Sequence, residues 1–205
     1  LRMLEQYLGP EQFREGVTHY LRAHAYANTE TNDLWDAIET TSGEPVRRIM
    51  DSWIWQPGFP LLTAETTDSG GRTSLVLTQR RFAYPTATPA VDDAQTAWVI
   101  PVHVRNGGVV STVLIDTTDP VVVELDEPDG VVVVNAGGHG FYRVAYDPAL
   151  RARLVDPDAM TRLATLERYS LVDDAWAATV AGRITASELL DFLDAFVGER
   201  EYGVW

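Results

Sequence analysis

The chain lacks two residue types that many catalytic and binding sites require. None of its 205 residues is cysteine, and all 16 basic residues are arginine, so lysine is absent as well. Without cysteine there is no thiolate nucleophile, no disulfide bond and no cysteine-ligated metal site. Without lysine there is no Schiff base, no pyridoxal-phosphate site and no phosphate-loop lysine. A chain free of cysteine also suits the cytoplasm, where we expect this protein to be located.

Basic residues and long apolar runs are scarce too. The 16 basic residues face 30 acidic ones, which gives a net charge of -14 at pH 7. A charge of that sign repels phosphate backbones and anionic lipids, so we expect neither a nucleic acid nor a membrane as a partner. No apolar run approaches the roughly 20 residues that span a bilayer, and the first residues do not resemble a signal peptide. We interpret both ends of the sequence as cuts in a longer protein.

Helical spacing dominates the first 57 residues. Thr31 is the expected N-cap of one helix and Gly43 its expected end. The next helix carries a buried face at i, i+3, i+4 and i+7, formed by Val46, Ile49, Met50 and Trp53. His19 and His24 stand five residues apart, which turns them roughly 140° from each other on a helix, whereas the zinc motif HExxH places its histidines four apart. We therefore predict that these two histidines share no metal ion.

Residues 58 to 147 have the pattern of a β-sandwich of roughly seven strands. The predicted strands are residues 61–67, 74–82, 98–105, 109–115, 121–125, 131–134 and 141–146. Glycine-rich turns, such as residues 106–108, separate several of them, which predicts antiparallel pairing. Pro101 indicates an edge strand or a bulge, and the stretch from Ala83 to Thr96 reads as a long loop.

The glycine cluster from Asn135 to Gly140 has the composition of a phosphate loop. Such a loop must open a helix, and here a strand follows, so we predict a structural turn. His103 and His139 have no second ligand nearby in the sequence, and we interpret both as structural histidines.

In the run GFYRVAYD, strand alternation places Phe141 and Arg143 on one face and Tyr142 and Val144 on the other. Both faces are bulky. This predicts a strand that packs on its own sandwich and also against a neighbouring domain, where Arg143 finds a carboxylate partner. As a core residue, Phe141 replaced by alanine is predicted to destabilise the sandwich by about 3 to 5 kcal/mol.

Residues 148 to 205 are predicted to be helical. Asp147 and Asp156, each followed by proline, are helix starts, and Thr185 with Glu188 forms a capping box. The predicted inward faces are Tyr169, Val172, Ala175 and Trp176 in one helix, and Leu189, Phe192, Leu193 and Phe196 in the next. Helix pairs of this kind open helical arrays, and a cut array exposes an apolar face, so we predict self-association through this tail.

Four runs together resemble the zinc aminopeptidases of the aminopeptidase N type, a gluzincin metallopeptidase family: LRMLEQYLG, NDLWDAIETTSGEPVRRIMDSW, QPGFP and GFYRVAYD. The resemblance covers essentially the whole chain. It implies that residues 1–57 end a thermolysin-like catalytic domain, that residues 58–147 form a β-sandwich domain, and that residues 148–205 begin a C-terminal helical domain. It also implies that the HExxH motif, its downstream glutamate ligand and the transition-state tyrosine precede Leu1.

On this interpretation the parent protein uses zinc to remove N-terminal amino acids from peptides. The 205 residues themselves hold no catalytic, cofactor-binding or metal-binding residue, make intramolecular contacts with the catalytic and helical domains, and are inactive alone. The alternative is a non-catalytic β-sandwich that binds other molecules, which would leave both helical flanks without a role. The pairs Asp92–Asp93 and Asp173–Asp174 resemble acid–base pairs, but adjacent helical residues point about 100° apart, so we predict that Asp173 and Asp174 lie on a solvated face.

Overall fold

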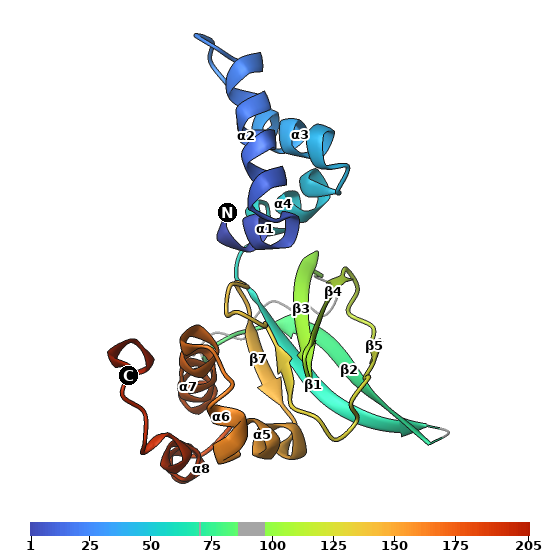
Figure 1. The fold of residues 1–205 in the computed structure, drawn as a ribbon. Coiled ribbons are helices and arrows are strands. Elements are labelled where there is room, and N and C mark those ends of the chain that lie inside the picture. Colours follow the sequence, from blue (N-terminus) through green and yellow to red (C-terminus); the bar gives the residue numbers. More distant parts are fainter. Residues whose placement is uncertain (70, 86–96) are drawn as a thin grey trace.

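The computed structural model describes residues 1–69, 71–85 and 97–205. Helices lie at one end of the molecule, two β-sheets form the middle, and further helices pack along one side of the sheets (Figure 1). This arrangement confirms the predicted mixed α and β fold class. Most of the predicted loop from Ala83 to Thr96, and with it the pair Asp92–Asp93, lies outside the described residues.

The first four helices are α1 (Arg2–Leu8), α2 (Pro10–Ala23), α3 (Thr31–Ser42) and α4 (Val46–Ile54). Val46, Ile49 and Met50 are buried as predicted, in a cluster shared with residues of α1 and α3. The N-cap of α3 is Glu30 and not Thr31, and the Asp33 carboxylate accepts a hydrogen bond of 2.8 Å from the backbone N–H of Glu30. The helical group is joined to the sheets through α4, since the Trp53 indole donates a hydrogen bond of 3.0 Å to the carbonyl of Val99.

Gly16 of α2 permits the close packing of α2 on α3. A Cβ atom at this position would lie 2.8 Å from the Cα of Ile38, a backbone atom that cannot rotate away. Gly16→Ala is therefore expected to lower the free energy of unfolding by about 1 to 3 kcal/mol, even though alanine has the higher helix propensity. Urea unfolding of this variant beside Gly108→Ala tests it, because a Cβ at Gly108 meets nothing within 4 Å. Equal stability of the two variants would contradict the packing argument.

The middle of the chain forms seven strands among the described residues, in two sheets. They are β1 (Pro60–Ser69), β2 (Arg72–Arg81), β3 (Ile100–Asn106), β4 (Val109–Ile115), β5 (Val121–Glu124), β6 (Val132–Val134) and β7 (Arg143–Tyr146). The sheet orders are β5-β2-β1-β7 and β4-β3-β6. Apolar side chains between the two sheets form the core, as a sandwich requires.

Two details of the sandwich differ from a simple antiparallel pattern. The pair β1–β7 is parallel, and the chain crosses from the second sheet back to the first between β6 and β7. Pro101 lies in β3, the central strand of its sheet, but β6 pairs with β3 only at residues 104 to 106. At Pro101 the strand is therefore a local edge, which is where proline is tolerated.

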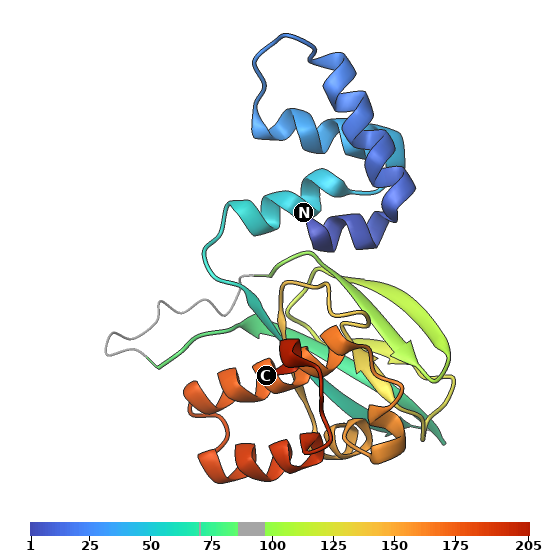
Figure 2. The ribbon, with the colours of Figure 1, turned by 60° about the vertical axis from the view of Figure 1, so that its left-hand side comes forward.

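The last helices are α5 (Pro148–Leu154), α6 (Pro157–Met160), α7 (Thr165–Val180) and α8 (Ala186–Leu193), followed by two short 3₁₀ turns. The predicted caps at Asp147, Asp156 and Thr185 are confirmed. Helices α7 and α8 lie side by side next to the sheets (Figure 2). Leu189, Phe192 and Phe196 are buried as predicted.

The predicted inward face of α7 is wrong in part. Tyr169 is 42% exposed and Trp176 is 58% exposed, whereas Glu167, Leu171 and Ala177 are buried. The apolar pattern of α7 misled the prediction because the face that meets the sandwich carries carboxylates.

Candidate functional site

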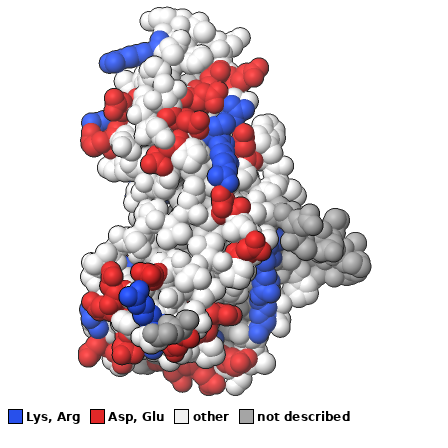
Figure 3. Space-filling view, turned by 90° about the vertical axis from the view of Figure 1, so that its right-hand side faces the viewer, with Lys and Arg blue, Asp and Glu red and all other residues white. Residues whose placement is uncertain are grey.

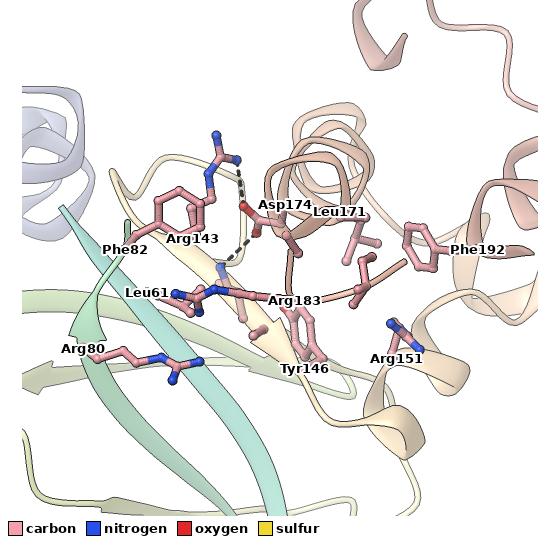
Figure 4. Close-up of a pocket in the computed structure, with 15 residues that line it drawn as sticks. Leu61, Arg80, Phe82, Arg143, Tyr146, Arg151, Leu171, Asp174, Arg183 and Phe192 are labelled. Atoms are coloured by element: carbon pink, nitrogen blue, oxygen red, sulfur yellow. Dashed lines mark hydrogen bonds and ion pairs between the residues drawn. The ribbon is translucent and has the colours of Figure 1, made fainter. Parts of the chain in front are cut away.

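The contact between α7 and β7 is built on Arg143. Its guanidinium donates hydrogen bonds to Asp173 at 2.5 Å and to Asp174 at 3.1 Å. The second carboxylate oxygen of Asp174 accepts a bond of 3.0 Å from the backbone N–H of Val144, and both contacts of Asp174 are drawn in Figure 4. The predicted carboxylate partner of Arg143 is thus confirmed, but the predicted solvated face is wrong for Asp174, whereas the Asp173 side chain is 35% exposed. The side chains of Arg143 and Asp174 are only 18% and 14% exposed, because the strand lies directly against this helix.

Two carboxylates share one guanidinium here, and this sets their electrostatics. Burial raises the pKa of Asp174 to about 7, although the Val144 N–H and Arg143 act in the opposite direction. The neighbouring charge of Asp173 adds to the increase. Burial alone would lower the pKa of Arg143, but its hydrogen bonds to Asp173 and Asp174 raise it above the ordinary value. Asp174 is therefore a carboxylate that takes up a proton at a higher pH than an ordinary aspartate does.

The raised pKa of Asp174 predicts a pH-dependent stability. The pKa of Asp174 in the folded state exceeds its ordinary value. Between about pH 4 and pH 7 the folded state therefore holds a proton on Asp174 that the unfolded state has lost. The stability that this group contributes is complete below about pH 4 and is lost as the pH rises through about 7. Relative to wild type, Asp174→Asn should therefore gain stability as the pH rises from 4 to 8.

Urea unfolding at each pH measures this difference. Asp129→Asn is a matched control, since it removes the same charge from a fully exposed side chain. A difference between wild type and Asp174→Asn that stays constant with pH would show that Asp174 does not titrate in this range.

A third carboxylate of α7 binds the other sheet. Glu167, whose side chain is 4% exposed, accepts a hydrogen bond of 2.5 Å from Arg105 of β3 and one of 2.9 Å from the N–H of Gly137. It also caps its own helix through the N–H of Ala164 at 2.8 Å. Glu167 therefore ties the start of α7 to both β3 and the glycine turn. We refer to Arg105, Glu167, Arg143, Asp173 and Asp174 together as the α7 clasp.

The glycine cluster is the turn on which α7 rests. Gly138 has φ of 71°, and a Cβ there would lie 2.7 Å from the Cβ of Leu166 in α7. A strand, β7, follows the turn, so it offers no helix N-terminus to a phosphate. The glycines allow the backbone of the turn to take positive φ angles, and they leave room for α7 to pack closely against it.

Phe141 is not the core residue that the alternation predicted. Strand β7 begins only at Arg143, and the Phe141 side chain is 67% exposed. Its ring lies 6.1 Å from that of Trp53 in α4 and 5.8 Å from that of Phe59. Phe141 thus contacts the segment that connects α4 to the sandwich, while its neighbour Tyr142 is 7% exposed and belongs to the sandwich core.

A pocket of about 230 Å³ lies beside the α7 clasp, between the sandwich and α7 (Figure 4). Arginine side chains from four different segments line it: Arg80, Arg143, Arg151 and Arg183. The remaining lining is largely apolar and includes Leu61, Leu171 and Phe192. No pattern in the sequence predicted this pocket, because its arginines stand far apart along the chain.

The four histidines do not converge on one site. His19 is exposed on α2, and His24 is the residue at which α2 ends. His103 shares a hydrogen bond of 2.9 Å with Thr112, and burial lowers the pKa of both His103 and His139. Among the residues that the structure describes, no three histidine or carboxylate side chains form a group that could hold a metal ion.

The described part of the chain contains no helix that is long and apolar enough to cross a bilayer.

Charge is distributed unevenly over the surface. On the face shown in Figure 3, acidic side chains gather in the upper part and at the lower end of the molecule, with arginines among them, and a largely uncharged area lies between the two groups on the left of the view. The arginines of the pocket contrast with this acidic character and with the net charge of -14.

Comparison with known proteins gives two family matches and several relatives. Residues 1–53 match the peptidase family M1 domain, and residues 131–205 match the ERAP1-like C-terminal domain. The chain is 36% identical over 203 residues to the tricorn protease-interacting factor F2 of Thermoplasma volcanium, covering 98% of this chain and 24% of that protein. It is 33% identical to aminopeptidase 2 of Candida albicans and 33% identical to aminopeptidase M1 of Arabidopsis thaliana, in each case over 100% of this chain.

The chain spans 22 to 24% of the length of these relatives. Its two ends match two different parts of one kind of protein, and the relatives align along nearly all of the sequence between them. The chain therefore belongs to peptidase family M1, as the four sequence runs indicated.

Proposed function

We propose that these 205 residues are the supporting part of a zinc-dependent aminopeptidase that removes N-terminal amino acids from peptides. The observation that carries this proposal is the family match at both ends, with residues 1–53 similar to the peptidase domain and residues 131–205 to the C-terminal domain. In this assignment residues 1–57 end the catalytic domain, residues 58–147 are the β-sandwich, and residues 148–205 begin the helical domain. The sandwich then lies between the two other units.

The described residues do not fit a zinc site. A catalytic zinc needs three protein ligands and an open coordination position, and the described histidines and carboxylates supply no such group. We therefore assign the zinc ligands, the base and the group that stabilises the oxyanion to other parts of the protein. The contribution of these residues is mechanical: α4 bonds to Val99 on one side of the sandwich, and the α7 clasp bonds to β3 and β7 on the other.

Hydrolysis of an aminoacyl anilide, measured together with bound zinc, tests the proposed function. A polypeptide that includes the HExxH segment should bind one zinc ion and release the amine, and the 205 residues alone should do neither. If the 205 residues bound a divalent ion tightly and hydrolysed the anilide, the assignment of a supporting role would be wrong. If the longer polypeptide bound zinc but had no activity on peptides or anilides, the aminopeptidase assignment would be wrong.

Exposed apolar residues at the end of the chain support the predicted self-association. Val197 is 86% exposed, Tyr202 is 94% exposed and Trp205 is 64% exposed. A helical array would cover such residues with its next repeat. In sedimentation experiments we expect the average mass of the 205-residue chain to rise with concentration, and Val197→Ser to reduce the rise. A strictly monomeric mass at high concentration would contradict the prediction.

A further inference from the structure

The arginine-lined pocket contains three arginines besides Arg143, the one that pairs with Asp173 and Asp174. Arg80 comes from β2, Arg151 from α5 and Arg183 from the turn after α7. Within residues 1–69, 71–85 and 97–205, none of these three side chains forms an ion pair. The one carboxylate in the lining, Asp174, is already bonded to Arg143 and to the N–H of Val144.

Two of these arginines lie close enough to repel each other. Burial lowers the pKa of Arg183, and the charge of Arg80 lowers it further. The guanidinium of Arg183 is held in place over the ring of Phe82, with its carbon 5.3 Å from the ring centre. Figure 4 shows the guanidinium groups of Arg80 and Arg183 near Leu61. Two neighbouring guanidinium groups that form no ion pair with the described residues favour a bound carboxylate, which can accept hydrogen bonds from both.

The other end of the pocket is apolar. Leu171, Ile184 and Phe192 line it, and Arg151 lies with its guanidinium carbon 6.0 Å from the centre of the Phe192 ring. A pocket of about 230 Å³ is small for a drug-sized ligand, so it suits a compact molecule. We propose that this pocket binds a small organic carboxylate, with the carboxylate between Arg80 and Arg183 and an apolar body against Leu171 and Phe192. This proposal is independent of the aminopeptidase assignment.

Calorimetric titration of the 205-residue chain with 3-phenylpropionate at low ionic strength tests the proposal. We expect saturable binding with one site per chain. In Arg183→Gln and in Arg80→Gln the affinity should fall by about tenfold or more. The matched control is Arg22→Gln, which removes the same charge from an exposed position on α2 far from the pocket. Thermal unfolding of each variant establishes that it is folded before it is titrated.

Two further ligands separate the parts of the proposal. The neutral amide, 3-phenylpropanamide, should bind much more weakly, because it cannot pair with two guanidinium groups. Inorganic phosphate should also bind more weakly, because it leaves the apolar end empty. The proposal is overturned if wild type shows no saturable binding, if Arg22→Gln weakens binding as much as Arg183→Gln does, or if the amide or phosphate binds as tightly as the carboxylate.

Discussion

Replacing Arg143 with methionine is expected to lower the free energy of unfolding by about 3 to 5 kcal/mol, the usual cost of removing one partner from a buried ion pair. Arg143 is the sole cation that contacts Asp173 and Asp174 within the described part of the chain. Without it, two carboxylates would face each other beside the apolar edge of β7. Urea unfolding at pH 8, where Asp174 is mostly ionised, measures the full effect.

The matched control is Arg48→Met. Arg48 forms an ion pair with Asp116, but its side chain is 58% exposed, so its loss should cost less than about 1 kcal/mol. Combining Arg143→Met with Asp174→Asn should recover part of the lost stability, because the pair of variants removes both the cation and the more deeply buried anion. If Arg143→Met were no more destabilising than Arg48→Met, the α7 clasp would not be the contact that joins the helices to the sandwich.

The sequence predicted the elements of this fold much better than their contacts. Strand and helix patterns are local, and so the predicted strands and the caps at Asp147, Asp156 and Thr185 match the structure. The inward face of α7 could not be read in the same way. Apolar periodicity assigns carboxylates to solvent. It misplaces them when they pair with arginines of a neighbouring strand in the interior.

The site shows the same limit. Arg143 was predicted to find a carboxylate because a bulky strand with an arginine on one face needs a partner. That the partners are Asp173 and Asp174 depends on the parallel placement of β7 beside β1, which no turn signal encodes. A local signal for Glu167 was present, since it stands at the third position of α7 and caps the helix. Its bond to Arg105 spans 62 residues, and only the folded chain shows it.

Tyr142 is the residue in the GFYRVAYD run whose truncation should most weaken the sandwich. Its ring is 7% exposed in the core cluster, and it lies so close to Gly140 that a Cβ there would be 2.2 Å from a ring carbon. Tyr142→Ala is expected to cost about 3 to 5 kcal/mol, as for other large aromatic residues removed from a core. Phe141→Ala should cost less than about 1 kcal/mol, because that side chain is mostly exposed.

The hydroxyl of Tyr142 makes this comparison sharper. It is buried, and it makes no hydrogen bond with any residue that the structure describes. Burial raises the pKa of Tyr142 well above its ordinary value, as expected for a phenol that cannot be solvated. Tyr142→Phe removes a polar group without a partner and keeps the ring, so it should be neutral or stabilising in urea unfolding. Destabilisation of Tyr142→Phe by more than about 1 kcal/mol would show that the hydroxyl is bonded in solution. If Phe141→Ala had a lower free energy of unfolding than Tyr142→Ala, the core residue of this run would be Phe141 and not Tyr142.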